Sequence, residues 1–512
     1  MIREASGIEL VAPARGYGER TAIFDTRGAH SYGELLDASA RVAAGLLKAC
    51  STADLQEQRV AFLAAPGFAW VAMQWGIWRA GGIAVPLPVG AARPELEYIL
   101  EDTGASMLCF DDAAAFQLAS IAGALGIRGI SFDELIATEP AALPEVASGR
   151  RAMILYTSGT TSKPKGVVTT HANIAAQITS LLEAWEWSAN DRIILCLPLH
   201  HVHGIINVLS CALWTGAMCE MLPRFDAAAV WGRIASGEVT LFMAVPTIYA
   251  RLIAAWEAAA PELQEAWTRG CAEVRLMVSG SAALPVSTLE RWREISGHTL
   301  LERYGMTEIG MALSNPYRGE RIPGCVGSPL PGVEVRLVGE DGAPVPVGLA
   351  GEIEVRGPGV FAEYWGKLEA TREAFRDGFP EGGLGWFRTG DTAVEEDGVY
   401  RILGRTSIDI LKSGGHKISA LEIEEVLRTH PDILECAVVG VPDAEWGERV
   451  AAALVLRADC TLELASLREW GREMLAVHKL PSRLLVVEAL PRNAMGKVVK
   501  PQVTRMFANE AE

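Results

Sequence analysis

Small hydroxyl residues, glycines and one framed lysine fill the segment YTSGTTSKPKG at residues 156–166. Glycine lets a backbone approach a ligand closely, hydroxyls donate hydrogen bonds, and Lys165 adds a positive charge, so this composition suits phosphate oxygens. Pro164 stands where a Walker loop requires its second glycine, so the segment is not of that type. An ordinary surface loop is the alternative, but such loops seldom combine so many hydroxyls with a framed lysine. The segment therefore indicates an enzyme that uses a nucleotide.

Three further segments carry residues suited to work on a nucleotide. RYGMTE at 303–308 places an aromatic ring, a hydroxyl and a carboxylate in one loop, and WFRTGD at 386–391 ends in an aspartate that we expect to be exposed. PRNAMGK at 491–497 ends in Lys497. An aspartate after Thr-Gly is often only a turn residue, and a lysine near a terminus is usually solvated. Gly496 reverses that expectation for Lys497, because glycine lets the lysine come close to a ligand.

The elements that must position these residues follow from the hydrophobic pattern. Up to about Val333 apolar strands alternate with amphipathic helices, as in RVAFLAAP followed by GFAWVAMQWGIWRAGG. Such alternation favours parallel sheets covered by helices. RAMIL before the phosphate segment indicates a strand and THANIAAQITSLLEAW after it a helix, so we expect the segment in a strand-to-loop turn at a sheet edge.

The pattern changes after Val333. Short strands separated by Gly, Pro and Asp turns, as in VEVRLVGEDGAPVP and GEIEVRGPG, indicate a β-rich subdomain. After GRTSIDILKSGGHKI the order is helix, strand, strand, helix, strand. We therefore predict an α/β protein: a large N-terminal domain of parallel α/β sheets plus a β-rich subdomain, followed by a small α+β C-terminal domain.

Composition narrows the partners and the location. A net charge of −17 and a pI near 5.2 argue against a nucleic-acid or anionic-membrane partner. The nine cysteines include no C-x-x-C pair, which indicates buried thiols in a reducing compartment. MIREASGIEL lacks the apolar stretch of a signal peptide, so we expect a cytoplasmic protein. Residues 193–219 carry no Asp, Glu, Lys or Arg, but Pro198 and three histidines favour a buried strand, turn and core helix over a membrane span.

Together the motifs resemble the adenylate-forming superfamily of acyl-CoA synthetases, adenylation domains and luciferases. LPLHHVHG, SGSAALP, GEIEVRGPG and GRTSIDILKSGGHKISALEIE also match it in order and spacing, so the resemblance covers nearly the whole chain. It implies an AMP-forming ligase that uses ATP, Mg²⁺ and coenzyme A. A carboxylate attacks the α-phosphorus of ATP to give an acyl-adenylate and pyrophosphate, and a thiol then displaces AMP. Positioning and charge neutralisation must supply most of the catalysis, since one anion attacks another.

The resemblance also implies a division of the chain and a motion. Residues 1–404 would form the N-terminal domain, residues 405–409 the hinge and residues 410–512 a mobile C-terminal domain that rotates between the two half-reactions. Ser407 stands where many relatives carry Asp or Lys, and the chain is one residue longer before Gly415, so we assign no single hinge residue. Ser162 replaces the glycine usual after the paired threonines, and we expect it to be tolerated with a slightly altered turn.

Roles for individual residues follow from the superfamily pattern. Thr160 and Glu308 would hold Mg²⁺, Tyr304 would stack on adenine, and Asp391 would accept hydrogen bonds from the ribose. The implied catalytic residues are Lys497, Glu308, Lys165 and His201. The implied nucleotide-binding residues are Thr157, Ser158, Gly159, Thr160, Thr161, Lys165, Ala282, Glu302, Tyr304, Gly305, Met306, Thr307, Asp391, Arg405 and Lys497. The implied CoA-binding residues are Ser413, Gly414, Gly415 and His416.

Arginines near the acyl pocket carry the prediction of the substrate. Most relatives have an uncharged residue where this chain has Arg303, and Arg251 and Ser281 are further candidates around the same pocket. An unpaired buried arginine is costly, and its fork binds a carboxylate bidentately, so we expect an acid with a second carboxylate. LERYGMTEIGMALS and VPDAEWGERV are similar to malonyl-CoA synthetases. That similarity implies malonate or methylmalonate held by Arg251, Ser281 and Arg303, with His201 at the pocket.

Several alternatives stay open at this point. For Arg251 the alternative is a solvated helix residue, and His200 either packs or touches the ligand. A CoA ligase for another short-chain or aromatic monoacid, or an adenylation enzyme that loads a carrier-protein thiol, would carry the same motifs. A nucleotide-binding regulatory protein that kept the fold but lost catalysis is the alternative from another class. Release of AMP in the presence of a thiol distinguishes that protein from a ligase.

Overall fold

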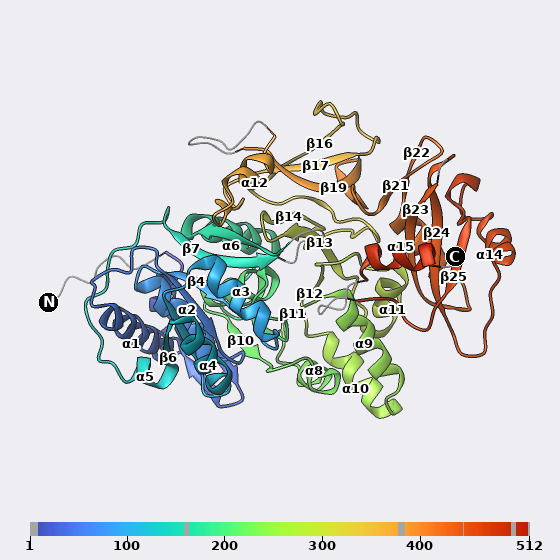
Figure 1. Cartoon of the computed structure of the whole chain (residues 1–512). Coiled ribbons are helices and arrows are strands. Elements are labelled where there is room, and N and C mark those ends of the chain that lie inside the picture. Colours follow the sequence, from blue (N-terminus) through green and yellow to red (C-terminus); the bar gives the residue numbers. More distant parts are fainter. Residues whose placement is uncertain (1–8, 158–162, 377–384, 444, 493–497, 510–512) are drawn as a thin grey trace.

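The structure is a computed structural model of the chain and describes residues 9–157, 163–376, 385–443, 445–492 and 498–509. Two large sheets, a smaller antiparallel sheet and a separate C-terminal sheet follow one another along the chain (Figure 1). This order confirms the predicted α/β fold with a β-rich subdomain and an α+β C-terminal part. Helices cover the two large sheets, because their central strands are buried on both faces.

The first large sheet has seven strands with a parallel centre. β7 and β8 pair antiparallel at one side, with Thr157 opposite Lys165. The strand predicted before the phosphate segment and the helix predicted after it are both present. β8, which lies between the segment and the helix, was not predicted from the sequence. In spatial order the strands are β18 (Glu363–Tyr364), β8 (Lys165–Thr170), β7 (Arg151–Thr157), β4 (Ile83–Pro86), β3 (Arg59–Leu63), β5 (Met107–Phe110) and β6 (Arg128–Ser131).

The second large sheet has nine strands, and its central strands are parallel. β13 and β14 form a hairpin at one side of it. In spatial order the strands are β15 (Ser328–Pro329), β14 (Gly310–Ser314), β13 (Leu301–Met306), β12 (Leu276–Ser279), β11 (Leu241–Ala244), β9 (Arg192–Leu195), β10 (Met218–Met221), β1 (Thr21–Asp25) and β2 (Gly28–Ser31). The carboxyl ends of neighbouring parallel strands meet at one edge of such a sheet, which is where ligands bind in α/β proteins.

Several helices of this N-terminal part begin at polar caps or prolines. Ser31 caps α1 and Thr170 caps α6, each with a reciprocal capping box. Stacked tryptophans Trp231, Trp267 and Trp292 join three of the helices. The helices are α1 (Tyr32–Cys50), α2 (Phe68–Arg79), α3 (Arg93–Thr103), α4 (Ala115–Leu125), α5 (Phe132–Ile136), α6 (His171–Trp185), α7 (Cys211–Thr215), α8 (Ala227–Ala235), α9 (Pro246–Glu257), α10 (Pro261–Cys271), α11 (Val286–Ser296) and α12 (Leu368–Glu373).

The charge-free run at residues 193–219 is folded into the core. It contains β9, a buried π-helical segment η2 (His203–Ser210), α7 and the start of β10. The prediction of a buried strand, turn and core helix is confirmed, except that the run ends in a strand. No helix in the described part of the chain is long and apolar enough to cross a membrane. π-helical turns occur often at functional sites, and this one starts at a histidine.

The β-rich subdomain is a four-stranded antiparallel sheet that leads into the C-terminal part. Its strands are β16 (Glu334–Val338), β17 (Gly351–Arg356), β19 (Phe387–Glu396) and β20 (Val399–Arg405). The sheet after it comprises β21 (Ile410–Ser413), β22 (His416–Ser419), β23 (Ile433–Asp443), β24 (Gly447–Leu456) and β25 (Arg483–Val486). It packs with α13 (Ala420–Leu427), α14 (Leu464–Gly471) and α15 (Lys500–Asn509).

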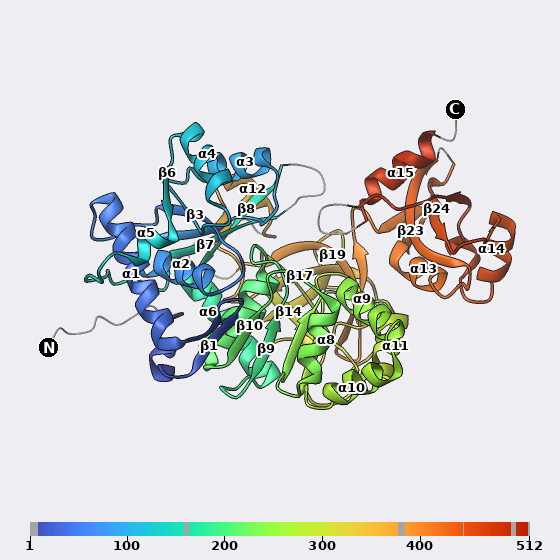
Figure 2. The same cartoon turned by 90° about the horizontal axis from the view of Figure 1, so that it is seen from below.

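The C-terminal part lies to one side of the molecule in both views (Figures 1 and 2). It has its own apolar clusters around β23 and β24. Among the described residues, the polar contacts that cross to the N-terminal part include three. The Glu425 carboxylate accepts from the Val286 amide at the start of α11, Lys417 pairs with Glu340, and the Ser419 hydroxyl donates to the Leu403 carbonyl. The boundaries at 404 and 409 remain predictions that this arrangement supports.

Candidate active site

Two of the residues predicted to line an acyl pocket lie near the carboxyl ends of strands in the nine-stranded sheet, together with a histidine that was not predicted. Arg303 is in β13, Ser281 follows β12, and His203 begins η2 after β9. Arg303 Nη2 donates to Ser281 Oγ at 3.4 Å, and His203 Nδ1 lies 3.2 Å from the same oxygen. The structure therefore brings Arg303 and Ser281 together as expected. It adds His203, which our reading of the sequence missed.

Arg303 is buried without a carboxylate partner among the described residues. Only 3% of it is exposed, and its Nε has no hydrogen-bond acceptor. Burial lowers the pKa of Arg303 to about 9. Gly280 makes room for the guanidinium, because a Cβ there would lie 2.5 Å from the Arg303 Cζ. Ser281 has a left-handed φ of 71°, unusual for a residue other than glycine, and it is exposed.

The other predicted residues of the acyl pocket lie in different surroundings. Arg251 is exposed on α9, with its guanidinium 5.8 Å from the ring of Phe225. His201 is half-buried, and its ring centre is 4.1 Å from that of His200. Burial lowers the pKa of His200 to about 3, so this ring is neutral near pH 7. The role of Arg251 and His201 in binding remains a prediction.

The nucleotide side of the predicted site is held together by Asp391. Tyr304 donates its hydroxyl to Asp391 Oδ2 at 2.6 Å, and Arg405 Nε lies 2.9 Å from Asp391 Oδ1. The predicted exposure of Asp391 is wrong: it is buried, because Tyr304 of β13 covers it from a strand distant in sequence. The structure brings these three residues together at the meeting of β13, β19 and β20.

Glu302 makes a contact within the protein, and its role in nucleotide binding remains a prediction. Its side chain is buried and accepts from the Leu284 amide at 3.3 Å, beside the exposed Ala282. Burial raises the pKa of Glu302 to about 8. The side chain therefore ties β13 to the loop after β12. Gly305, Met306 and Thr307 are half-buried at the end of β13 and in the turn that follows it.

Glu308 and Lys165 lie on either side of one tyrosine. The Tyr364 hydroxyl donates to Glu308 Oε1 at 2.9 Å, and the Lys165 ammonium lies 4.9 Å from the centre of the Tyr364 ring. Tyr364 reaches this position because β18 pairs with β8, whose first residue is Lys165. Burial raises the pKa of Glu308, although the Tyr364 hydroxyl and Lys165 oppose that rise. Our reading of the sequence missed Tyr364.

The surroundings of Glu308 suit a magnesium ion that also binds a ligand's phosphates. They do not resemble a metal site made of protein side chains alone. The described residues contain no group of three or more His, Cys, Asp or Glu side chains that could hold a metal. Mg²⁺ is commonly bound by one or two carboxylates together with substrate phosphates and water. A single buried carboxylate facing a lysine suited to phosphate matches that pattern. Bound Mg²⁺ would supply positive charge to the phosphate oxygens.

The phosphate segment is anchored at both ends of its described part. Tyr98 donates to the Pro164 carbonyl at 2.8 Å, and Trp365 N donates to the Gly166 carbonyl at 2.8 Å. Thr157, at the end of β7, is half-buried and donates to the Lys165 carbonyl at 3.5 Å. These contacts fix the direction in which the segment leaves the sheet. The predicted residues Ser158, Gly159, Thr160, Thr161 and Lys497 lie outside the described residues.

The predicted CoA segment forms a tight hairpin on the C-terminal part. Ser413 pairs with His416 across Gly414 and Gly415, whose φ angles of 57° and 82° suit a two-residue turn. A Cβ on Gly414 would lie 2.8 Å from the Trp446 ring. The exposed His416 stacks on His478 at 4.4 Å. The described contacts of this hairpin are thus with the C-terminal part, away from Arg303.

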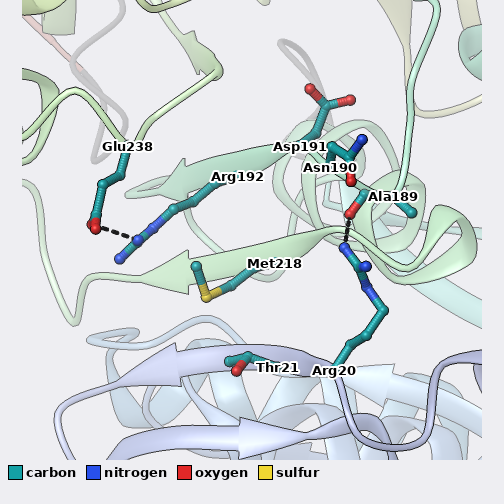
Figure 3. Close-up of a pocket in the computed structure, with 8 residues that line it drawn as sticks. All are labelled: Arg20, Thr21, Ala189, Asn190, Asp191, Arg192, Met218 and Glu238. Carbon is teal, nitrogen blue, oxygen red and sulfur yellow. Dashed lines mark hydrogen bonds and ion pairs between the residues drawn. The ribbon is translucent and has the colours of Figure 1, made fainter.

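A polar hollow lies at the opposite end of the strands from the candidate site. It is lined by Arg20, Asp191, Arg192 and Glu238, among others, near the first residues of β1, β9 and β10 (Figure 3). Arg192 pairs with Glu238, and Arg20 donates to the Ala189 carbonyl. Asp191 pairs with Arg275. The charges lining this hollow already have partners in the protein, which distinguishes it from the surroundings of Arg303.

Comparison with known proteins gives consistent matches over the whole chain. Residues 10–365 match the family model described as AMP-binding enzyme, and residues 422–497 match the AMP-binding enzyme C-terminal domain. The chain is 47% identical to the malonate–CoA ligase ACSF3, mitochondrial, of Mus musculus, over 96% of this chain and 90% of that protein. It is 39% identical to a malonate–CoA ligase of Arabidopsis thaliana, over 96% and 87%.

Solved structures agree with these matches. The crystal structure of ATP-bound MatB from Rhodopseudomonas palustris is similar with a TM-score of 0.89 and 33% identity, over 99% of this chain and 100% of that chain. The o-succinylbenzoate CoA synthetase MenE from Bacillus subtilis, in complex with its acyl-adenylate, gives a TM-score of 0.83 and 28% identity, over 97% and 98%. The arrangement of sheets and C-terminal part is therefore that of adenylate-forming enzymes.

Proposed function

The chain belongs to the AMP-binding enzyme family, and from that membership we propose that it is an ATP-dependent malonate–CoA ligase. The enzyme first joins a carboxylate of the acid to AMP and releases pyrophosphate. It then transfers the acyl group to the thiol of coenzyme A and releases AMP. Two malonate–CoA ligases that are 47% and 39% identical to this chain, each over 96% of it, support this activity.

The observation that carries the choice of acid is the buried, unpaired guanidinium of Arg303. A charge taken out of water is costly unless an opposite charge or hydrogen bonds compensate it, and the described part of the chain supplies no carboxylate. A diacid brings that carboxylate: one end reacts with ATP while the other meets Arg303. Malonate and methylmalonate are the smallest such acids. A monoacid would leave Arg303 buried and uncompensated.

We assign the remaining roles as follows. Lys165 meets the phosphates of ATP, Glu308 holds Mg²⁺ together with Thr160, and Asp391 with Arg405 holds the ribose beside Tyr304. Lys497 bridges the reacting carboxylate and the α-phosphate, and the hairpin at residues 413–416 guides the pantetheine arm. The contacts of Asp391 and of Tyr364 with Glu308 support these roles, because they fix the side chains in place before a ligand arrives.

The location of the protein is a separate proposal. The N-terminal segment favours the cytoplasm, whereas the mouse relative is named as mitochondrial. Fractionation of the source cells with an antibody to the native protein distinguishes the two. The observation behind the cytoplasmic choice is a set of acidic residues, because transit peptides are poor in them: Glu4, Glu9, Glu19 and Asp25.

Release of AMP from ATP, Mg²⁺ and CoA tests the activity and the acid together. Malonate, methylmalonate, succinate, acetate, butyrate and benzoate are compared at equal concentrations, with the mass of each thioester confirmed. We expect malonate or methylmalonate to be preferred. Preference for a monoacid would support a CoA ligase but contradict the diacid substrate. No AMP release with any of the six acids would contradict a ligase that uses free CoA.

A further inference from the structure

Arg303 and His203 meet on one hydroxyl group, that of Ser281. Both are almost fully buried, with 3% of Arg303 and 4% of His203 exposed, whereas Ser281 is exposed. The two side chains come from different elements, β13 and η2, and lie next to each other only because their strands end at the same edge of the sheet. A ligand that reaches Ser281 therefore meets a cation and an imidazole together.

The tautomer of His203 depends on where the Ser281 hydroxyl proton lies. A guanidinium can only donate, so Ser281 Oγ accepts from Arg303. We assign the hydroxyl proton of Ser281 to the contact with His203 Nδ1, which lies 3.2 Å away. With that assignment the ring proton of a neutral His203 sits on Nε2. Burial and the charge of Arg303 lower the pKa of His203 well below its usual value, which keeps the ring neutral.

Two buried N–H donors remain without an acceptor in the described part of the chain: Nε2–H of His203 and Nε–H of Arg303. A lone orphan nitrogen does not mark a site, since His171 in the core beside Trp78 has two of them. His203 differs because its other nitrogen shares a hydroxyl with a buried cation. One positive charge and two donors, on side chains that share one hydroxyl, suit an anion with two acceptor oxygens, that is, a carboxylate.

We propose that the second carboxylate of the acid is held by one cation and one neutral donor, Arg303 and His203, and that His203 is a specificity-determining residue. The proposal rests on the proposed function and deepens it. Arg251 is exposed and lies against Phe225, so a clamp of two arginines is not needed to neutralise the acid. A neutral second donor adds a hydrogen bond of defined direction without adding charge. It therefore favours a carboxylate, because both oxygens of that group accept hydrogen bonds.

The test compares two substitutions at the same ring. His203→Leu removes both nitrogens, whereas His203→Gln keeps an N–H near the position of Nε2. Malonate-dependent exchange of pyrophosphate into ATP measures the first half-reaction without CoA. We expect His203→Leu to lower kcat/KM for malonate about 10- to 100-fold, mainly through KM, as for a lost hydrogen bond to a charged group. His203→Gln should stay within about fivefold of the native enzyme.

His171→Leu is the matched control, because it replaces another buried neutral histidine that lies in the core. It should change the melting temperature while leaving the KM for malonate unchanged. Malonamate, the malonic acid monoamide, is the complementary substrate, because its distal NH₂ would face an N–H donor of the enzyme. The native enzyme should therefore have a low kcat/KM for malonamate. His203→Leu should reduce the ratio of kcat/KM for malonate to that for malonamate. The KM for ATP should be the same in all variants.

The outcomes separate this inference from the proposed function. If the native enzyme does not exchange pyrophosphate with malonate, the proposed function fails. If it does, equal kcat/KM for His203→Leu and native enzyme overturns the inference alone. Equal losses for Leu and Gln also overturn it, because shape and not the donor would then matter. A larger loss for Arg251→Gln than for His203→Leu would restore the clamp of two arginines.

Discussion

Two cations of this chain, the buried Arg303 and the largely buried Lys500, have opposite surroundings. Lys500, at the start of α15, lies 2.5 Å from Asp409 Oδ1 and 2.8 Å from Glu424 Oε1. Burial alone would lower the pKa of Lys500, but Glu424 and Asp409 together raise it. Arg303 has no carboxylate among the described residues, and its pKa falls to about 9. A buried cation with partners holds a structure together, whereas one without partners is prepared for a ligand.

The position of each cation agrees with that distinction. Asp409 also accepts from the Arg405 amide and so joins the connection after β20 to α13 and α15. Arg303 has a single hydroxyl, that of the exposed Ser281, as a described side-chain partner, and it lies beside Gly280. The presence or absence of a carboxylate partner is thus enough to distinguish a cation that stabilises the fold from one that binds a ligand. The following predictions test that contrast, beginning with the largest effect.

Removal of the unpaired cation should cost activity and not stability. Arg303→Met should lower kcat/KM for malonate by about a thousandfold, because the distal carboxylate would be buried without its charge partner. The melting temperature should stay or rise, since an uncompensated buried charge is gone. Steady-state rates with malonate and acetate, together with thermal unfolding, check both halves. An unchanged malonate-to-acetate ratio would contradict the diacid.

Removal of the paired cation should do the reverse. Lys500→Met leaves Asp409 without this cation and Glu424 with Arg428 alone, and should lower the free energy of unfolding by about 3 kcal/mol. The exposed Lys412 provides the matched control: Lys412→Met should change that free energy by no more than about 0.5 kcal/mol. Urea unfolding followed by circular dichroism measures both. Equal stability of the two variants would refute a supporting role for the Lys500 ion pairs.

One substitution can remove the hydroxyl that donates a hydrogen bond to Glu308. Tyr364→Phe keeps the ring beside Lys165 and deletes only the hydroxyl that donates to Glu308. The concentration of free Mg²⁺ that gives half-maximal rate should rise about tenfold, because the carboxylate loses a partner that fixes its orientation. Tyr249→Phe removes a core hydroxyl that donates to the Val278 carbonyl, and its Mg²⁺ dependence should match that of native enzyme. A shared Mg²⁺ dependence of both variants would argue against positioning by Tyr364.

Raising the pH titrates Arg303 before Lys500 and so separates the two cations without a mutation. Above pH 9 the ligand-free enzyme loses the Arg303 proton, and kcat/KM for malonate should fall about tenfold per pH unit. Folding is not weakened by this group, because the unfolded chain binds the proton up to the ordinary arginine pKa, so its contribution to stability rises with pH in that window. The KM for ATP, measured in parallel, corrects for other groups that titrate. A flat malonate profile would mean that Arg303 keeps its proton or is not used.

The sequence predicted the fold better than the contacts within the site. Alternating apolar strands and helices predicted β3 and α2, because burial on both faces leaves a local pattern. β8 was missed, because GVVTT reads as a short apolar run without its own turn signals. The charge-free run at 193–219 was correctly placed in the core, yet its local composition could not indicate a π-helical turn.

Within the site, a residue whose chemical type stands out in its segment was predicted. Residues whose role depends on partners distant in sequence were not. Arg303 was recognisable as a cation at the edge of an apolar strand. His203 and Tyr364 were not recognised, because their partners are 78 and 56 residues away in sequence. The same cause explains the error about Asp391, which Tyr304 covers from 87 residues away. Three histidines within one apolar run were the available signal for His203.

Gly280 has a consequence for how this pocket could change during evolution. A methyl group there would lie 2.5 Å from the Arg303 Cζ and displace the guanidinium. Substitution by alanine requires a single nucleotide change in any glycine codon, so one common mutation could abolish selection of the acid while leaving Arg303 itself in the gene. The ancestry of substrate preference among relatives would then be recorded at a residue that has no side chain.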